Sequence, residues 1–382
     1  MKKLTQKIIA LAMAATCSVS AAAVSASAAG ISSLAKDSLE SAVSKGADVV
    51  NAQSADGYWS KNLSRNGQTA YCKIVDALTK FQDSVTLSNN LDSKELAEIP
   101  QIIQQEHPEI FYVDILNSKP AKAKNENGFV VSYIYNFKYM SNARQKVSDV
   151  ESAANKILAN APKSGSDYDK ELYVHDQLRN LVSYKVGENN IYNSLVEHKG
   201  SCMGYSLAMQ YLLNKLGVTC RVQTGVATNP KGNKEDHMWN IVTLNGKEYL
   251  VDVTWDDVLV NGYNYAPYRY FNVTKDMMSE THTPKNASEW SKCTNTDQDW
   301  YRKNGFYFNS WDEVMKAMPT MIAKQGGDKG NPVSFRLPST KMANEISSHI
   351  TGGTAGSMND LTGGKAIYTS KKGTLGATGF RY

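Results

Sequence analysis

Apolar residues recur at helical spacing in several stretches of the chain and alternate with polar residues in others. Spacings of three and four residues indicate amphipathic helices, and short alternating or apolar runs indicate strands. The pattern predicts helices at residues 31–50, 68–81, 93–105, 147–158, 169–182 and 340–349. It predicts strands at residues 84–87, 110–113, 129–135 and 333–337. The elements between residues 68 and 135 predict a small α+β unit, and this unit shows no titratable residues at catalytic spacing.

The first residues have the character of a secretory signal. Lysines precede an apolar run from Ile8 to Ala15, and small residues continue as far as Ala28. A membrane-spanning helix is the alternative, but it needs about 20 strongly apolar residues, and Thr16 and later serines interrupt this stretch. We therefore expect a cleavable signal at residues 1–28, an exported mature chain, and no transmembrane segment after cleavage.

The remaining chain of about 350 residues suits two or three domains. Residues 29–140 hold the N-terminal helices and the small α+β unit. Residues 141–325 hold the next helices and the residues with candidate chemistry. Residues 326–382 begin with a Gly-rich stretch, and their pattern predicts a strand–helix–strand extension.

Charge and cysteine content exclude several classes of protein. The formal charge of +5, from 42 basic and 37 acidic residues, falls to +2 when the three signal lysines are removed, so nothing indicates nucleic-acid binding. The mature chain has four scattered cysteines without metal-ligand spacing, and it has no loop of EF-hand type. We therefore expect no metal site and no cofactor. Export still permits a disulfide among Cys72, Cys220 and Cys293.

Cys202 lies at the predicted start of a helix. It follows Gly200 and Ser201, and an apolar-periodic run after it stops at Gly217. At a helix N-terminus, unpaired N–H groups and the positive end of the dipole favour thiolate over thiol. The same N–H groups are able to hold a tetrahedral oxyanion. Taken alone, a buried packing cysteine is an equally good interpretation of this segment.

A predicted hairpin follows. An Asn-Gly turn at residues 245–246 separates strands at 237–244 and 247–253, and this dipeptide is the strongest signal for a two-residue hairpin turn. The turn fixes the pairing of the two strands.

In this register Trp239 lies opposite Asp252, and His237 lies opposite Thr254. His237 and Asp252 are then diagonal neighbours, about 7–8 Å apart at the backbone, and their side chains can meet. A carboxylate there accepts one imidazole N–H and leaves the other nitrogen to take a thiol proton. A lone histidine on a strand is usually structural, and Asp252 has the alternative of stabilising a turn. The combined order of Cys202, His237 and Asp252 favours a catalytic triad.

These residues lie in three short motifs: Gly200-Ser201-Cys202-Met203-Gly204-Tyr205, His237-Met238-Trp239-Asn240 and Asp252-Val253-Thr254-Trp255-Asp256. The motifs and their order resemble those of the transglutaminase-like superfamily, and the resemblance covers about residues 141–285. It implies a papain-like α+β fold in which a nucleophile helix packs on an antiparallel sheet. It also implies that Cys202 is the nucleophile, that His237 is the base and acid, and that Asp252 orients the histidine.

Neighbouring residues have candidate roles with open alternatives. Tyr192 is a candidate second oxyanion donor, or else a hydrophobic anchor with a bonded hydroxyl. Trp239 and Trp255 are expected to form the wall of the site and exclude water. Structural, turn or solvent-facing positions are expected for Asp256, Asp257 and His282.

A triad of this type forms a thioester acyl-enzyme from a carboxamide or peptide. An amine then gives a cross-link, and water gives deamidation or proteolysis; nothing in the sequence marks an amine site, which favours hydrolysis or general acyl transfer slightly. We expect a secreted cysteine enzyme acting on protein or peptide amides, with the cell wall as a candidate location. The alternatives are a non-catalytic surface protein that keeps the fold as a scaffold, and a wall-binding module in residues 29–140 and 326–382.

Overall fold

The computed structural model describes residues 57–229, 232–259, 264, 266–326, 332–338 and 377–381. The predicted signal and the predicted helices at 31–50 and 340–349 lie outside these residues. The chain divides into two compact units, Met1–Ser141 and Asn142–Tyr382. None of the helices in the described ranges has the length and apolar character needed to cross a bilayer.

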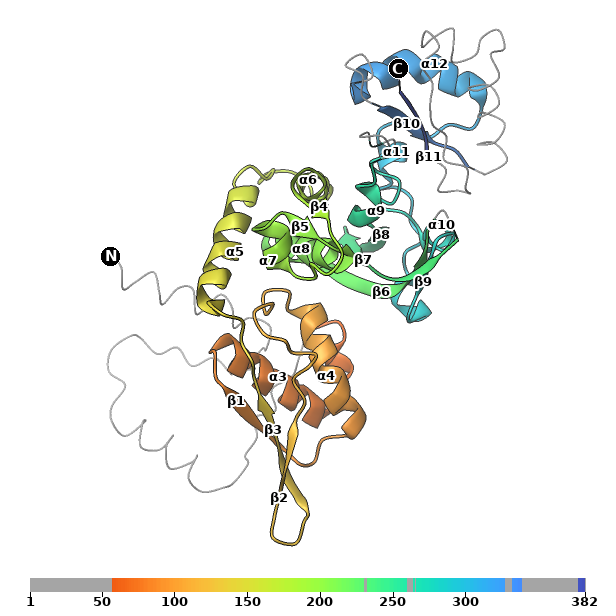
Figure 1. The fold of residues 1–382 in the computed structure, drawn as a ribbon. Helices are drawn as coiled ribbons and strands as arrows, with labels where there is room; N and C mark the ends of the chain where they lie inside the picture. Colours follow the sequence, from red (N-terminus) through yellow and green to blue (C-terminus); the bar gives the residue numbers. More distant parts are fainter. Residues whose placement is uncertain are drawn as a thin grey trace, which may run out of the picture. The chain divides into compact units, whose positions relative to one another are not determined.

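In the first unit, two helices lie next to a three-stranded antiparallel sheet (Figure 1). The helices are α3 (Arg65–Thr79) and α4 (Ser93–Glu106), and a short 3-10 helix, η1 (Ser60–Asn62), precedes them. The sheet has the order β1-β3-β2, with strands β1 (Ser84–Ser88), β2 (Ala121–Lys124) and β3 (Val130–Asn136). The Asp92 side chain accepts N–H bonds from the first turn of α4, which explains where that helix begins.

The structure corrects two predictions in this unit. Residues 110–113 form turns rather than a strand, and only Val113 makes an isolated bridge. Their apolar side chains are buried by ring packing instead, as where Tyr112 stacks on Phe81 with 4.7 Å between ring centroids. Strand β2 was not predicted, because it alternates alanine with lysine and therefore shows no apolar face.

The second unit contains a layer of helices and a four-stranded antiparallel sheet. The helices of the layer are α5 (Ala143–Leu158), α6 (Asp167–Leu181), α7 (Ile191–Leu195) and α8 (Cys202–Lys215). The sheet has the order β8-β7-β6-β9, with strands β6 (Cys220–Thr228), β7 (Lys234–Leu244), β8 (Lys247–Val251) and β9 (His282–Pro284). Helix α8 packs on β6 and β7 and also contacts α6 and α7 (Figure 1).

Smaller elements complete this unit. Two short parallel strands, β4 (Ser183–Tyr184) and β5 (Lys199–Gly200), lie ahead of α8. After the sheet come α9 (Val253–Asp256), α10 (Lys275–Met278), η2 (Ala287–Trp290), α11 (Trp300–Lys303), α12 (Trp311–Gln325), β10 (Pro332–Arg336) and β11 (Ala377–Arg381). The strand predicted at 333–337 is thus observed as β10. Its Arg336 is fully buried, forms an ion pair with Asp299 at 3.1 Å and donates to the carbonyl of Arg269 at 2.7 Å.

Two polar contacts fix α8 on the central strand of the sheet. The Asn240 amide donates to the carbonyl of Ser206 at 2.9 Å, and the Ser206 hydroxyl donates to the carbonyl of Met238 at 2.9 Å. All three residues of these contacts are buried. Because buried polar groups are costly when unpaired, these contacts hold the helix in one position along β7.

The predicted hairpin register is confirmed over its strands, from Leu244 paired with Lys247 to Asn240 paired with Val251. The strand itself ends earlier than predicted. Asp252 begins helix α9, and its carboxylate accepts the N–H of Trp255 at 3.1 Å. The predicted pairing of His237 with Thr254 is therefore wrong, because a local aspartate cap replaces the next ladder bond.

Gly225 in β6 provides a test of this packing. A Cβ added there would overlap the carbonyl oxygen of Thr283 in β9 and lie 2.7 Å from Cη2 of Trp239. We expect Gly225→Ala to lower the free energy of unfolding by about 1–3 kcal/mol, the usual range for overpacking a core. Urea denaturation measures this change. The adjacent, half-buried Thr224→Ala is the control, and equal stability losses in the two variants would contradict the assignment of β9 to this edge.

Candidate active site

The structure brings Cys202, His237 and Asp252 together. His237 Nε2 lies 2.7 Å from Asp252 Oδ2, and the Cys202 side chain forms a hydrogen bond with His237. Since Nε2 is bound to the carboxylate, Nδ1 is the ring nitrogen that remains for the thiol. His237 and Asp252 are buried, whereas Cys202 is half-buried. The imidazole therefore lies between an accessible thiol and a buried carboxylate.

Cys202 is the first residue of α8, and the backbone around it is tightly packed. Ser201 precedes the helix without capping it, because its hydroxyl bonds to Asn189 Oδ1 instead. The first N–H groups of the helix thus have no side-chain cap. Gly204, in the first turn, would place a Cβ 2.7 Å from the carbonyl oxygen of Glu188, so only glycine allows this close approach. This packing fixes the cysteine at the positive end of the helix dipole.

The charges of His237 and Asp252 depend on each other. Burial by itself would lower the pKa of His237, but the adjacent carboxylate and the bond with Cys202 raise it to about 10. Burial by itself would raise the pKa of Asp252, but His237 and His282 hold it well below its usual range. The pair is therefore stable as imidazolium and carboxylate at neutral pH.

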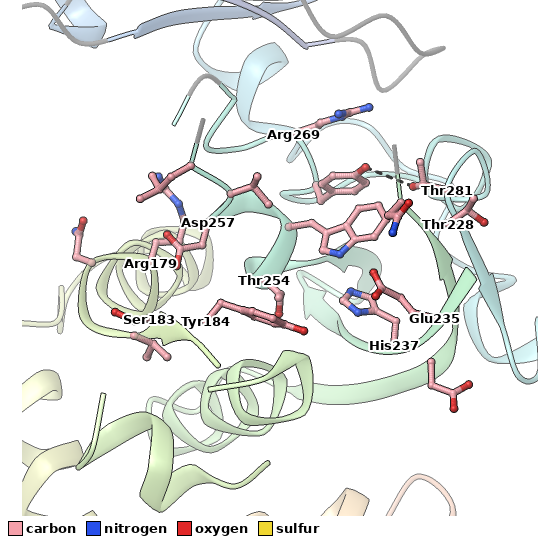
Figure 2. A pocket seen from close by; sticks show the side chains of 18 residues that line it. Arg179, Ser183, Tyr184, Thr228, Glu235, His237, Thr254, Asp257, Arg269 and Thr281 are labelled. Carbon is pink, nitrogen blue, oxygen red and sulfur yellow. Dashed lines mark hydrogen bonds between the residues drawn. The ribbon is translucent and has the colours of Figure 1, made fainter. Parts of the chain in front are cut away.

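A cavity of about 1000 Å³ adjoins this group, and Figure 2 shows His237 among the side chains that line it. Its lining includes the rings of Tyr184 and Trp255 and the exposed apolar side chains of Val258 and Leu259. Cys202 does not line the cavity. Tyr184 does, and its pKa is raised by burial and next by the charge of Cys202. The cavity therefore reaches Tyr184 and His237, the residue that is hydrogen-bonded to the thiol.

Acidic and basic side chains also line the cavity: Arg179, Glu235, Asp236, Asp257 and Arg269. Arg179 is partly neutralised, because it forms an ion pair with Asp176 at 3.2 Å. Asp257 lies 2.6 Å from the Tyr205 hydroxyl, and burial raises its pKa to about 6. The cavity thus combines apolar rings with several charged groups.

Two predicted site residues lie elsewhere. Trp239 is fully buried and does not line the cavity, so the expectation that it forms a wall is wrong; it packs behind His237 with 6.1 Å between ring centroids. Trp255 lines the cavity as expected. Tyr192 lies on α7 and is not a lining residue, and Lys146 Nζ lies 3.9 Å from its ring centroid. The structure thus assigns Tyr192 a cation–π contact.

Asp256 is fully buried, so the expectation of a turn or solvent-facing position for it is wrong. Its carboxylate lies 3.1 Å from Nε2 of His175 in α6 and accepts the N–H of Tyr270 at 2.8 Å. Arg179 Nε donates to its carbonyl at 3.0 Å. These contacts fasten α9, and with it Asp252, to helix α6. No local pattern marks this role, because each partner is distant in sequence.

His282 belongs to the same group of side chains, although only a structural position was expected for it. Its Nε2 lies 3.0 Å from Oδ2 of Asp252, the oxygen that also contacts His237. One ring nitrogen each of His237 and His282 and one carboxylate oxygen of Asp252 lie within 4.8 Å of one another, a spacing that could also hold a metal ion. Separations of 2.7 and 3.0 Å between nitrogen and oxygen are those of hydrogen bonds, so the geometry is explained by two imidazoles that donate to one carboxylate.

The other cysteines have a different environment. Cys72, Cys220 and Cys293 are buried, and none of the cysteines in the described ranges forms a disulfide. Burial raises the pKa of Cys220 and that of Cys293. Cys220 is the first residue of strand β6, is buried there and behaves as a packing residue.

Part of the chain is similar to known proteins. Residues 151–253 match the model of the transglutaminase-like superfamily. No curated protein matches the chain. Among solved structures, a TGase is 13% identical with a TM-score of 0.25, and the match covers 45% of this chain and 50% of that one.

Two further structures are similar to parts of the chain. A candidate cysteine protease from Cytophaga hutchinsonii is 15% identical with a TM-score of 0.24, over 36% of this chain and 62% of that one. A candidate protease from Parabacteroides distasonis is 14% identical with a TM-score of 0.22, over 34% and 29%. The chain thus spans less than two thirds of each of these three structures. Residues 151–253 are therefore a transglutaminase-like core.

Proposed function

We propose that the protein is a secreted cysteine enzyme that forms a thioester acyl-enzyme on amide groups of proteins or peptides. The observation that carries this proposal is the position of His237, which is hydrogen-bonded to Cys202 and lies 2.7 Å from Asp252. A nucleophile, a base and a group that orients the base are the parts that thiol-dependent acyl transfer requires.

In this mechanism the proton of the Cys202 thiol has already passed to His237 Nδ1, which leaves an imidazolium, and the thiolate attacks the carbonyl carbon of the substrate amide. The tetrahedral intermediate collapses when the imidazolium gives its proton to the leaving nitrogen, which departs as ammonia or an amine. A thioester remains on Cys202. Water or a second amine then attacks the thioester, His237 takes its proton, and the thiol forms again as the acyl product leaves. Asp252 keeps its charge throughout and stabilises the imidazolium.

The uncapped N-terminus of α8 supports the step in which charge develops on the carbonyl oxygen. The backbone N–H of Cys202 is the proposed oxyanion donor, since the helix start presents N–H groups without side-chain caps. The cavity supplies room for a substrate side chain beside the thiol, with Trp255, Val258 and Leu259 for apolar contacts. We assign the exported location from the predicted signal at residues 1–28, and the cell envelope is the proposed place of action.

Replacement of the nucleophile is the first test. We expect Cys202→Ala to lower turnover of a glutamine-containing peptide by at least ~10³-fold, because no other group can form the thioester. The free energy of unfolding should change by less than about 1 kcal/mol, since the side chain is only half-buried. Mass spectrometry follows the peptide with and without an added primary amine and separates hydrolysis from amine transfer. Cys72→Ala is the matched control, and a fully active Cys202→Ala enzyme would exclude the mechanism.

The charge of Asp252 sets the second test. Because the carboxylate raises the pKa of His237 to about 10, the imidazolium that protonates the leaving group persists well above pH 7, and turnover should fall only as pH approaches 10. Asp252→Asn removes that charge, so the alkaline fall should move to lower pH and kcat should drop by up to ~10⁴-fold. Rate measurements from pH ~6 to ~10 decide this. An unmoved alkaline limb in the variant would show that Asp252 does not control His237.

Thiol reactivity gives a third test that needs no substrate. Iodoacetamide should modify Cys202 faster than Cys220 or Cys293, which are buried and have raised pKa values. Peptide mapping by mass spectrometry identifies the modified residue. His237→Ala should slow the modification of Cys202 by about tenfold or more, because the group that takes its proton is lost. Equal rates in the two proteins would show that no working thiol–imidazole pair exists.

A further inference from the structure

We propose that His282 is a positioning residue of this active site, and that it donates a hydrogen bond which fixes the Asp252 carboxylate in the direction of His237. The inference rests on the function proposed above for its effect on turnover, while the hydrogen bond itself can be measured independently. His282 Nε2 lies 3.0 Å from Asp252 Oδ2, and His237 Nε2 lies 2.7 Å from the same oxygen.

The protons of this group can be assigned from donor and acceptor chemistry. An ionised carboxylate only accepts hydrogen bonds, so both imidazoles must carry a proton on Nε2. His282 Nδ1 lies 2.8 Å from the Thr281 hydroxyl, which is able to donate to it. His282 is then a neutral ring that accepts from Thr281 and donates to Asp252. A hydrogen-bonded chain therefore runs from Thr281, at the cavity, through His282 and Asp252 to His237.

The surroundings of His282 explain why it stays neutral. Its side chain is fully buried, and burial is the first cause that lowers its pKa. The positive charges of His237 and Arg269 lower it further, and Asp252 opposes them. Tyr270, which is also titratable, lies against the ring at 5.4 Å between centroids. Both nitrogens of this ring have partners, Nε2 at Asp252 and Nδ1 at Thr281, so the ring is placed to donate one fixed N–H to the carboxylate.

The geometry gives each oxygen of the Asp252 carboxylate at least one donor. Oδ1 accepts the N–H of Trp255 at 3.1 Å, and Oδ2 receives both imidazoles. The His282 ring is itself held by the rings of Trp255 at 4.6 Å and Trp239 at 5.0 Å. Because the carboxylate is held on both oxygens, it cannot rotate away from His237 while the imidazole moves through its protonation steps.

The first experiment measures the tautomer of His282 in the unaltered protein. Nitrogen-15 spectra of the imidazole rings show which nitrogen carries the proton, and the assignment uses the loss of signals in His282→Gln. We expect neutral His282 with its proton on Nε2 at pH 7, and a His237 Nε2–H resonance that moves when His282 is replaced. A proton on His282 Nδ1, or a doubly protonated His282, would overturn the proposal whether or not the protein turns over a substrate.

The second experiment compares two replacements in turnover. His282→Phe keeps a ring but loses the donor, and we expect kcat to fall about 10- to 100-fold with KM little changed, as for the loss of a hydrogen bond to a charged group. His282→Gln retains an N–H donor at a similar reach and should recover most of that loss. Equal losses in both variants would indicate packing alone and overturn the positioning role.

If His282→Phe does not fold, Thr281→Val is a second variant that tests the same proposal. It removes the hydroxyl that lies 2.8 Å from His282 Nδ1 and leaves both histidines in place. We expect a smaller fall in kcat and a measurable population of the other His282 tautomer. An unchanged tautomer in this variant would contradict the proposed chain. If instead Cys202 proved unreactive while the His282 tautomer agreed, the proposed enzyme function would fail and the hydrogen bond would stand.

Discussion

The buried carboxylate of Asp252 is the constraint on which the rest of the site depends. An ionised group without exposure to water costs several kcal/mol unless donors surround it. Here an imidazole from β7, an imidazole from β9 and the backbone N–H of Trp255 supply those donors. Each comes from a different part of the chain, so the charge that orients His237 also ties together the elements that carry the site.

The scaffold holds both ends of the hydrogen-bonded chain. Ser206 and Asn240 fasten α8, which carries Cys202, to the strand that carries His237. Asp256 and His175 fasten the short helix that begins at Asp252 to α6. Relative motion of these elements would break buried hydrogen bonds, whose polar groups would lose their partners. Each side chain of the site is therefore held by a bonded residue that lies three or four positions away from it along the chain.

Short-range sequence patterns predicted the parts of this site that depend on residues close together in the chain. The Asn-Gly turn predicted the register of the hairpin. The apolar run between Cys202 and Gly217 predicted the helix that begins at Cys202. The sequence also predicted Asp252 beside His237, but as a residue of the strand. Counting residue pairs along the two strands does not reveal that Asp252 ends its strand and caps the helix that follows. His282 was not predicted to contact Asp252, since it lies 30 residues further along the chain.

Burial, which makes hydrogen-bond donors necessary for Asp252, also distinguishes Cys202 from the other cysteines of the described ranges, because Cys202 is half-buried and the others are buried. A thiol in an apolar interior resists ionisation, and burial raises the pKa of Cys220 and Cys293 accordingly. Cys202 is half-buried at a helix N-terminus, beside an imidazole whose pKa is raised to about 10 by its carboxylate. The helix end and the imidazole of His237 are the two groups of positive character beside this thiol. Among the cysteines in the part of the chain that the structure describes, Cys202 differs from Cys220 and Cys293 in its partial exposure and in its contact with His237.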